Sequence, residues 1–498
     1  MKNKKLFIKK PIHVMTTSAV LVTALFTTFT PSTSTSTQSV VYAAEVTKQV
    51  KRDGDTISSG EKQRIIEQFK DIVNTKKKHA YKEHSVIVKF QKHVTDQQRQ
   101  DFLENSNLQL VNQIVNDEVV ELSLKDQSLT PENLEMLNAS KLVEYAEPNY
   151  LFHFNDENEY SKKKTPKMLD PDQWGLKNIN YPGKDINVEE AWKITKGSPD
   201  IVVAVIDNGV DWKHTDLMDR IWTNKKETLN GKDDDGNGYI DDIRGWDFAD
   251  NDNNPDEHDD DDHGTPIAGV IAATENGSGT IGVAPNVKIM PLRVLGNKNN
   301  SNDNNIASMV KAIDYAIKNG AKIINFSIGT PSESLTIKEA VKRAKDANVL
   351  FVAAAGNTES GGKNNDTTPF YPASYSKEFS NVIAVGNMEE TGSIAFTSNY
   401  GVKSVNIAAP GTSILSTSNI IGNGEMYTSE NTGTSFAAPF VTGVAALMLS
   451  VNSNYTPEQI RKIIEETATA HEPFNNKFKV AGFLNAGKAV KSAQEGRL

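Results

Sequence analysis

Three side chains of this 498-residue chain are of the types that perform nucleophilic catalysis: Asp207, His263 and Ser435. A serine hydroxyl is a poor nucleophile unless an imidazole takes its proton and a carboxylate holds that imidazole in the correct tautomer. Aspartate, histidine and serine in this chain order form one of the known arrangements of such a triad. The three residues therefore predict a serine nucleophile, with His263 as its base and Asp207 as the group that orients the histidine.

Each of these residues also fits an ordinary structural role when it is taken alone. Asp207 ends an apolar stretch and precedes Asn208, as turn and helix-capping aspartates do. His263 stands before a run of small residues and fits a loop or capping histidine. Ser435 precedes the apolar helical run 436–449 and fits a helix cap. The chemical interpretation therefore depends on all three residues occurring together.

The elements that must position these residues are apolar strands alternating with helices. The strands are predicted at 201–206, 288–291, 322–327, 349–354, 382–385 and 404–407. Between two of them, apolar residues from 306 to 317 follow the helical spacing i, i+3, i+4, i+7, and Gly320 closes the helix. This alternation predicts an α/β fold with a doubly wound, mostly parallel sheet. Asp207 then lies at the carboxyl edge of the first strand, where open α/β sheets place their sites.

The residues around the three side chains resemble the motifs of the subtilisin-like serine proteases, or subtilases. Residues 205–211 (VIDNGVD) resemble the aspartate motif of that family, 263–269 (HGTPIAG) the histidine motif and 433–439 (GTSFAAP) the serine motif. The resemblance covers roughly residues 80–490. It implies a subtilisin-like fold and a serine endopeptidase that hydrolyses polypeptides through an acyl-enzyme intermediate.

The resemblance also implies roles for residues outside the triad. The side-chain amide of Asn357 is expected to stabilise the oxyanion together with the backbone N–H of Ser435, although Asn357 beside Gly356 also fits an ordinary turn. Substrate is expected to pair as an extended strand with residues 327–329, and a specificity pocket is expected beyond them. The implied substrate-binding residues are Ser327, Ile328, Gly329, Ala354, Gly356 and Phe370.

Acidic residues are concentrated in one segment of the chain, whose formal net charge is −10. Residues 232–262 contain 14 acidic residues against two basic ones. This distribution excludes a uniformly acidic surface, and the absence of a basic face argues against a nucleic-acid partner.

The acidic segment begins with a partial calcium-binding pattern. Residues 233–241 match the first nine positions of a D-x-[DN]-x-[DN]-G loop, with Asp233, Asp235, Asn237 and Asp241 as expected ligands. The twelfth position is Arg244 instead of a bidentate glutamate, so a solvated acidic loop is the alternative.

Two more calcium sites are implied by the family resemblance. Asp247, Asp250 and Asp252 resemble a calcium loop of heat-stable subtilases, and Asp170, Asp216 and Asn276 fall where the family has a strong site. All of these ligands are oxygen atoms, which favours Ca²⁺ over a transition metal. Because the chain has no cysteine, structural Ca²⁺ is the expected means of fastening its loops.

The N-terminal third predicts export as an inactive precursor. Residues 1–44 combine five lysines, an apolar stretch and small residues before a cleavage site, which indicates a secretion signal; a retained signal anchor is the alternative. Residues 45–165 are predicted to be a propeptide whose α+β core, about 80–153, resembles the subtilase inhibitor. Residues 166–498 form the predicted catalytic domain. We expect a secreted monomer that has no membrane contact after signal removal and whose own propeptide inhibits it.

Two other functions are compatible with these motifs. One is a dedicated processing protease that trims a single peptide precursor. The other is an inactive homologue that serves as a binding protein.

Overall fold

The computed structural model describes residues 57–77, 80–115, 118–125, 128–153, 172–257, 262–296, 304–419 and 426–497, except for the side chain of Glu430. The chain divides into two units, 1–56 and 57–498, and the features below belong to the second. The predicted signal segment lies outside the described residues, and so do residues 154–171, which make up most of the stretch between Tyr150 and Asp170 where the sequence predicts the propeptide cut.

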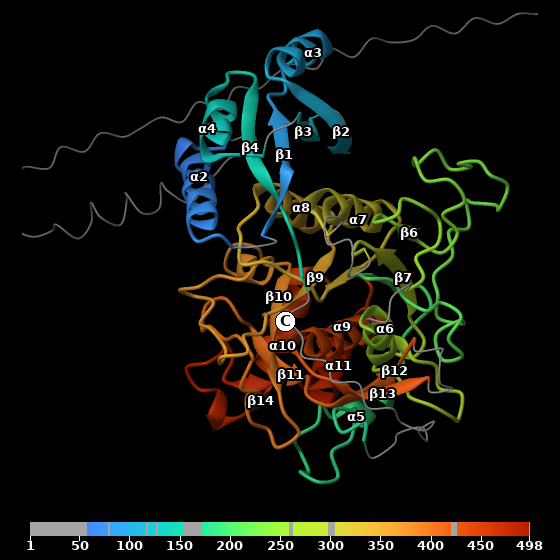
Figure 1. The fold of residues 1–498 in the computed structure, drawn as a ribbon. Helices are drawn as coiled ribbons and strands as arrows, with labels where there is room; N and C mark the ends of the chain where they lie inside the picture. Colours follow the sequence, from blue (N-terminus) through green and yellow to red (C-terminus); the bar gives the residue numbers. More distant parts are fainter. Residues whose placement is uncertain are drawn as a thin grey trace, which may run out of the picture. The chain divides into compact units, whose positions relative to one another are not determined.

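A nine-stranded sheet forms the centre of the described C-terminal part, residues 172–497 (Figure 1). Its order is β14-β15-β11-β10-β9-β8-β5-β7-β6, and every neighbouring pair is parallel except β14 with β15. The strands are β5 (Val202–Asp207), β6 (Trp246–Asp247), β7 (Lys288–Arg293), β8 (Ile323–Phe326), β9 (Leu350–Ala354), β10 (Val382–Met388), β11 (Ile407–Pro410), β14 (Thr469–Ala470) and β15 (Gly482–Phe483). A hairpin of β12 (Ile414–Thr417) and β13 (Tyr427–Asn431) lies apart from this sheet.

Helices cover both faces of the sheet, because successive strand residues enter two different cores. Val203 and Val205 of β5 belong to one core together with α6 (Gly264–Ala272), α9 (Thr434–Val451), α10 (Pro457–Thr467) and α11 (Ala486–Gln494). Ala204 and Ile206 belong to the other core, with α7 (Ile306–Lys318) and α8 (Leu335–Asp346). The short helix α5 (Val188–Trp192) contacts α11. The prediction of a doubly wound, mostly parallel sheet is confirmed.

Strand β5 lies where the winding of the sheet changes direction. It pairs with β7 on one side and with β8 on the other, and the chain then continues outward on both sides. In such sheets the crevice at the carboxyl ends of the central strands is the usual place for a site. Asp207, the last residue of β5, stands at that point.

The N-terminal part, residues 57–153, is a separate α+β layer. Its antiparallel sheet has the order β2-β3-β1-β4, formed by β1 (Tyr81–Phe90), β2 (Leu108–Val115), β3 (Val119–Leu124) and β4 (Val143–Tyr150). Helices α2 (Ser59–Asn74), α3 (Asp96–Asn105) and α4 (Pro131–Ala139) accompany it. Because Ile65, Ile66 and Phe69 of α2 lie in the core of this layer, the layer begins upstream of the predicted residue 80.

Strand β11 begins later than the sequence predicts, at Ile407 instead of Ser404. The side-chain oxygen of Asn406 accepts a hydrogen bond from the backbone N–H of Ala384, at 2.8 Å. The N–H of Ala384 is therefore bound by a side chain, whereas in a regular strand pair it would be bound by a backbone carbonyl group. Regular pairing of β10 with β11 starts at Val385 with Ile407.

Among the described residues, one helix has the length and composition to cross a membrane, α9. It is 89% buried inside the fold and forms the central helix of one core.

Candidate active site

Asp207 and His263 form a direct hydrogen bond between Oδ1 of the aspartate and Nδ1 of the histidine, at 2.6 Å. Both residues are buried. The backbone N–H of Asn208 donates to the same aspartate oxygen at 2.9 Å, which fixes the orientation of the carboxylate. A buried carboxylate on Nδ1 leaves Nε2 as the atom of His263 that can exchange a proton.

Ser435 is the second residue of α9, beside this pair. The rings of Phe436 and His263 lie 5.3 Å apart between centroids, so the start of α9 packs against the histidine. Because the first N–H groups of a helix have no partner within it, the backbone N–H of Ser435 is suited to bind an anion. The hydroxyl of Ser435 donates to the carbonyl oxygen of Ser327 at 2.9 Å, and it must rotate toward His263 to react.

A hydrogen-bonded network fastens the end of β8 to α9. The hydroxyl of Ser327 donates to the carbonyl oxygen of Ser435 at 2.9 Å. Asn325 donates to that hydroxyl at 2.9 Å and accepts from the hydroxyl of Thr442 at 2.8 Å. All four residues are buried, so the position of Ser435 relative to β8 is fixed by several contacts.

Asn357 lies next to the start of α9, which carries Ser435. Its side-chain oxygen accepts a hydrogen bond from the backbone N–H of Thr434 at 3.0 Å, and the N–H of Gly356 donates to the hydroxyl of Thr434 at 3.0 Å. The contact through Oδ1 fixes the rotation of the amide group and leaves the Nδ2 group as the donor of this side chain. An amide donor beside a serine nucleophile is the arrangement that an oxyanion hole requires.

The predicted substrate-binding residues also converge, because two glycines make room for Phe370. A Cβ atom on Gly329 would overlap the Phe370 ring, and one on Gly356 would lie 2.8 Å from it. The ring is only 6% exposed, and the backbone N–H of Phe370 donates to Ser374 at 3.1 Å. Ser327 and Ile328 precede Gly329 at the end of β8, and Ala354 ends β9. Phe370 and the two glycines therefore lie together near the carboxyl ends of β8 and β9, where Ser327 bonds to Ser435.

The end of the N-terminal part pairs with the same edge. His153 and Gly329 form an antiparallel bridge, in which the N–H of His153 donates to Gly329 at 3.2 Å and the N–H of Gly329 donates back at 3.4 Å. The ring of Phe152 packs edge-on against Phe326, with 6.3 Å between centroids. An extended segment therefore already occupies the edge at which substrate is expected.

Strand β4 of the N-terminal part caps two helices of the C-terminal part. Buried Glu147 accepts hydrogen bonds from the N–H groups of Leu335 and Thr336, at 2.8 and 3.1 Å, at the start of α8. Asn149 accepts from the N–H of Ile306 at 3.2 Å, at the start of α7. Burial raises the pKa of Glu147 to about 7. These contacts join the two parts at helix termini, where unpaired N–H groups favour carboxylate and amide oxygens.

The loop at the start of the acidic segment brings three carboxylates together, Glu227, Asp233 and Asp235, and one oxygen of each lies within 4.8 Å of the other two. Glu227 is 8% exposed, and its Oε2 is buried without a hydrogen-bond partner. Hydrogen bonds from backbone N–H groups, that of Gly238 foremost, hold the pKa of Asp233 below its usual range. Within the described ranges this is the only group of three such side chains that converges in this way.

Two other predicted ligands of this loop have different partners in the structure. Asn237 donates through its side chain to Asp242 at 2.9 Å. Asp241 accepts from the backbone N–H groups of Asn230 and Gly231, each at 2.9 Å. Glu227 was not predicted, because it lies six residues before the pattern and no spacing rule connects it to the loop.

Two of the ligands predicted for the second calcium site, Asp247 and Asp250, bind a cationic side chain of the protein. Buried Arg293 forms ion pairs with Asp247 and with Asp250, the latter at 2.6 Å. Asp252 pairs with Asp247 through the backbone, in an antiparallel bridge. The guanidinium group therefore neutralises much of the charge of this loop.

Two of the three ligands predicted for the third calcium site, Asp216 and Asn276, lie together in the structure. Asn276 donates to Asp216 at 2.8 Å, and the hydroxyl of Tyr427 donates to the other oxygen of Asp216 at 3.0 Å. Asp170 lies outside the described residues.

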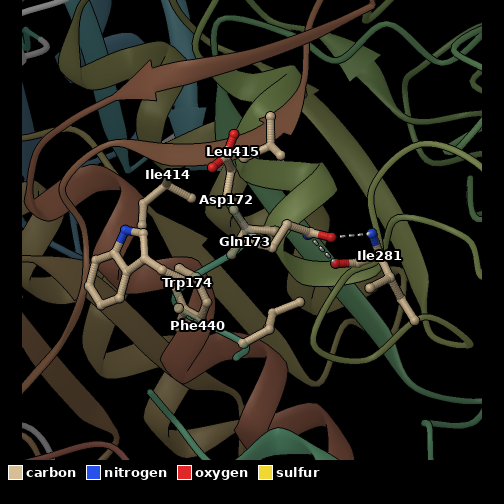
Figure 2. A pocket seen from close by; sticks show the side chains of 10 residues that line it. Asp172, Gln173, Trp174, Ile281, Ile414, Leu415 and Phe440 are labelled. Carbon is tan, nitrogen blue, oxygen red and sulfur yellow. Dashed lines mark hydrogen bonds between the residues drawn. The ribbon is translucent and has the colours of Figure 1, made fainter. Parts of the chain in front are cut away.

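A small cavity near the start of the C-terminal part is too small for a substrate. Figure 2 shows the Gln173 amide bonded to both backbone groups of Ile281, with Trp174 and Phe440 also lining the cavity. The free volume is about 10 Å³, which is room for one water molecule at most. None of the triad residues lines this cavity.

Comparison with known proteins gives two family matches along the chain. Residues 198–485 match the profile of the subtilase family, and residues 67–149 match the fervidolysin N-terminal prodomain. The chain is 36% identical over 418 residues to a thermophilic serine proteinase of Bacillus sp. (strain AK1), covering 83% of this chain and 88% of that protein. It is 41% identical over 207 residues to subtilisin DY of Bacillus licheniformis, covering 42% of this chain and 70% of the other.

A solved structure has a similar fold. Fervidolysin from Fervidobacterium pennivorans, described as a keratinolytic enzyme related to subtilisin, superposes with a TM-score of 0.64 at 25% identity. The match covers 83% of this chain but 62% of the fervidolysin chain, so this protein spans less than two thirds of that relative.

Proposed function

The chain belongs to the subtilase family and is a serine endopeptidase with an N-terminal prodomain, and we propose that it cleaves extended polypeptides through Asp207, His263 and Ser435. The observation that carries this proposal is the 2.6 Å bond between Asp207 and His263, directly beside the start of α9 that presents Ser435. We propose further that the enzyme is secreted, that Ca²⁺ stabilises it and that the prodomain inhibits it until cleavage.

In the proposed mechanism His263 accepts the proton of Ser435 through Nε2 while Oγ attacks the substrate carbonyl carbon. Asp207 holds the imidazole in the required tautomer and stabilises the imidazolium. The developing oxyanion receives hydrogen bonds from the backbone N–H of Ser435 and from Nδ2 of Asn357. His263 then protonates the leaving amine, and a water molecule hydrolyses the acyl-enzyme by the same steps.

Substrate recognition is proposed to depend mainly on backbone pairing. The antiparallel pairing of His153 with Gly329 supports this proposal, because it demonstrates that this edge accepts an extended segment. The ring of Phe370, which packs against Gly329 and Gly356, is proposed to form the apolar floor of the specificity pocket, and no acidic residue stands between Thr367 and Pro372. We therefore expect broad cleavage without a strict requirement for a basic residue.

The prodomain is proposed to act as an intramolecular inhibitor. Its last described residues pair with the substrate edge, and Glu147 and Asn149 fix β4 to α8 and α7. We propose that the cut that releases the prodomain falls between Tyr150 and Asp170. Export then releases an active enzyme only outside the cell, which agrees with the signal-like residues 1–44.

Ca²⁺ is proposed to bind at Glu227, Asp233 and Asp235. The residues fit this ion, because a buried carboxylate oxygen without a partner points to a missing cation and the donors are all oxygen. When bound, the ion would neutralise the loop and fasten it, and it takes no part in the chemistry. The sites at Asp247, Asp250 and Asp252 and at Asp170, Asp216 and Asn276 remain part of the calcium proposal.

Removing Ca²⁺ is expected to lower the thermal midpoint. If free Ca²⁺ stands at about 100 times its dissociation constant, its loss costs about 2.7 kcal/mol, or roughly 3 °C for a chain of this length. The measurement is calorimetry of the inactive Ser435→Ala precursor with and without chelator, which avoids self-digestion. Glu227→Gln should abolish most of the difference, whereas Glu466→Gln, an exposed carboxylate on α10, should preserve it. If the precursor that retains Glu227 has the same thermal midpoint with and without chelator, the calcium proposal is refuted.

Replacing Asn357 with alanine is expected to reduce kcat by about 10²–10³-fold with little change in KM. This is the range caused by loss of such a donor in subtilisin, another member of the family. The reason is that the amide acts on the oxyanion, which exists only after the attack. Steady-state kinetics on a peptide substrate tests it, and an unchanged kcat would remove Asn357 from the oxyanion hole.

A digest of one denatured protein, read by mass spectrometry, tests the proposed function as a whole. We expect many cleavage sites with varied residues before the cut. A single cleaved bond would favour a dedicated processing protease instead, and no cleavage by the mature chain would favour a binding protein.

A further inference from the structure

We propose that Glu257 is a positioning residue for the catalytic histidine: its carboxylate, reaching α6 from the preceding loop, holds the backbone of His263 and the first turn of that helix. The inference rests on the proposed function, since it concerns how the same histidine is held. Glu257 belongs to none of the three motifs that identify the family.

Helix α6 needs such a partner because its own N-cap residue is already engaged. His263 occupies the N-cap position, and its side chain makes no capping hydrogen bond. An N-cap side chain normally accepts a hydrogen bond from the first turn, but this imidazole is directed to Asp207. The backbone N–H of Gly264 donates to Oδ1 of Asn208 at 2.9 Å. The N–H groups of His263 and Thr265 need a different acceptor, because a buried N–H without one is costly in a protein interior.

Glu257 supplies the missing acceptors with both of its oxygens. Oε1 accepts from the backbone N–H of His263 at 2.7 Å and from that of Gly264 at 3.2 Å. Oε2 accepts from the backbone N–H of Thr265 at 3.3 Å and from its hydroxyl. Glu257 is 8% exposed, so these bonds are shielded from water. One side chain thus replaces the cap that the catalytic histidine cannot provide.

The loop after Asp207 in turn holds the segment that carries Glu257. The N–H of Val210 donates to the carbonyl of Pro255 at 3.1 Å. Gly209 has φ 112°, and a Cβ atom there would lie 2.8 Å from the backbone nitrogen of Glu257. A Cβ atom on Gly264 would overlap the carbonyl oxygen of Gly209. Glu257 therefore lies between the loop that follows Asp207 and the helix that follows His263, where it fixes the two relative to each other.

The test is Glu257→Gln in the mature enzyme, with kcat calculated per active site titrated by a serine-directed phosphonate. Glutamine keeps the size of the side chain but presents an NH₂ group to backbone N–H donors, so the start of α6 must shift. A displacement of about 1 Å can cost about 10²-fold in rate, and we expect kcat per titrated site to fall about 10- to 100-fold, with KM within about twofold of the original. An unchanged kcat per titrated site would overturn the proposal, even if fewer molecules were active.

A control separates positioning from stability. Thr456→Ala removes the side-chain cap of α10, a helix whose first turn has no contact with the triad, and should lower stability while kcat per titrated site stays the same. If the glutamine variant fails to mature, Glu257→Asp keeps a carboxylate that is one methylene shorter and should give an intermediate kcat; a full kcat in that variant would equally overturn the proposal. If the unsubstituted enzyme cannot be titrated by the phosphonate, the proposed function fails and not this inference.

Discussion

Replacing Ser435 with alanine is expected to lower the rate of peptide cleavage by about 10⁴-fold or more and to leave the precursor uncut. The hydroxyl supplies the attacking oxygen, and no neighbouring side chain can take its place. The fold should persist, because the side chain makes one hydrogen bond, to the carbonyl of Ser327, and α9 is held by its apolar packing. Electrophoresis of the purified chain and a peptide cleavage assay measure both effects.

Ser450→Ala is the matched control for this substitution, since Ser450 lies near the other end of the same helix and its hydroxyl bonds to the carbonyl of Ala446. This variant should mature and cleave normally. A Ser435→Ala chain that matures and cleaves at the original rate would mean that another residue is the nucleophile.

Replacing Asp207 with asparagine is expected to lower kcat by about 10⁴-fold, although the two side chains have the same shape. A buried amide can donate to Nδ1 of His263, which would place the imidazole proton on Nε2 and remove the base from Ser435. The bond of 2.6 Å and the complete burial of Asp207 leave water no opportunity to correct the tautomer. Steady-state kinetics at neutral pH measures the loss.

Asp200→Asn, an exposed aspartate just before β5, is the control and should retain full kcat. If Asp207→Asn also kept full kcat, the carboxylate would not be needed to orient His263.

Sequence motifs predicted the site residues Asp207, His263 and Ser435, and each of these lies at the end of a strand or the start of a helix, where a local pattern is visible in the sequence. The apolar strands predicted the sheet because both of its faces are buried, as the two cores of β5 demonstrate.

Other features depend on contacts between segments that no local pattern connects. Glu227 completes the acidic cluster, but it lies outside the twelve-residue calcium pattern. Arg293 ends β7 and reaches Asp247 and Asp250 only because β6 and β7 are neighbours. Helix α2 is mostly polar in sequence, and Ile65, Ile66 and Phe69 become part of a core only where the helix packs against α4 and β4. Each of these contacts is set by the tertiary fold.

The most direct test of the central claim is covalent labelling of the mature enzyme by a serine-directed phosphonate, followed by mass spectrometry of its peptides. The account predicts one adduct, on Ser435, and no adduct in the Asp207→Asn chain over the same time, because the hydroxyl then lacks its base. An adduct on a different residue, or the absence of any adduct in the unsubstituted mature enzyme, would contradict it.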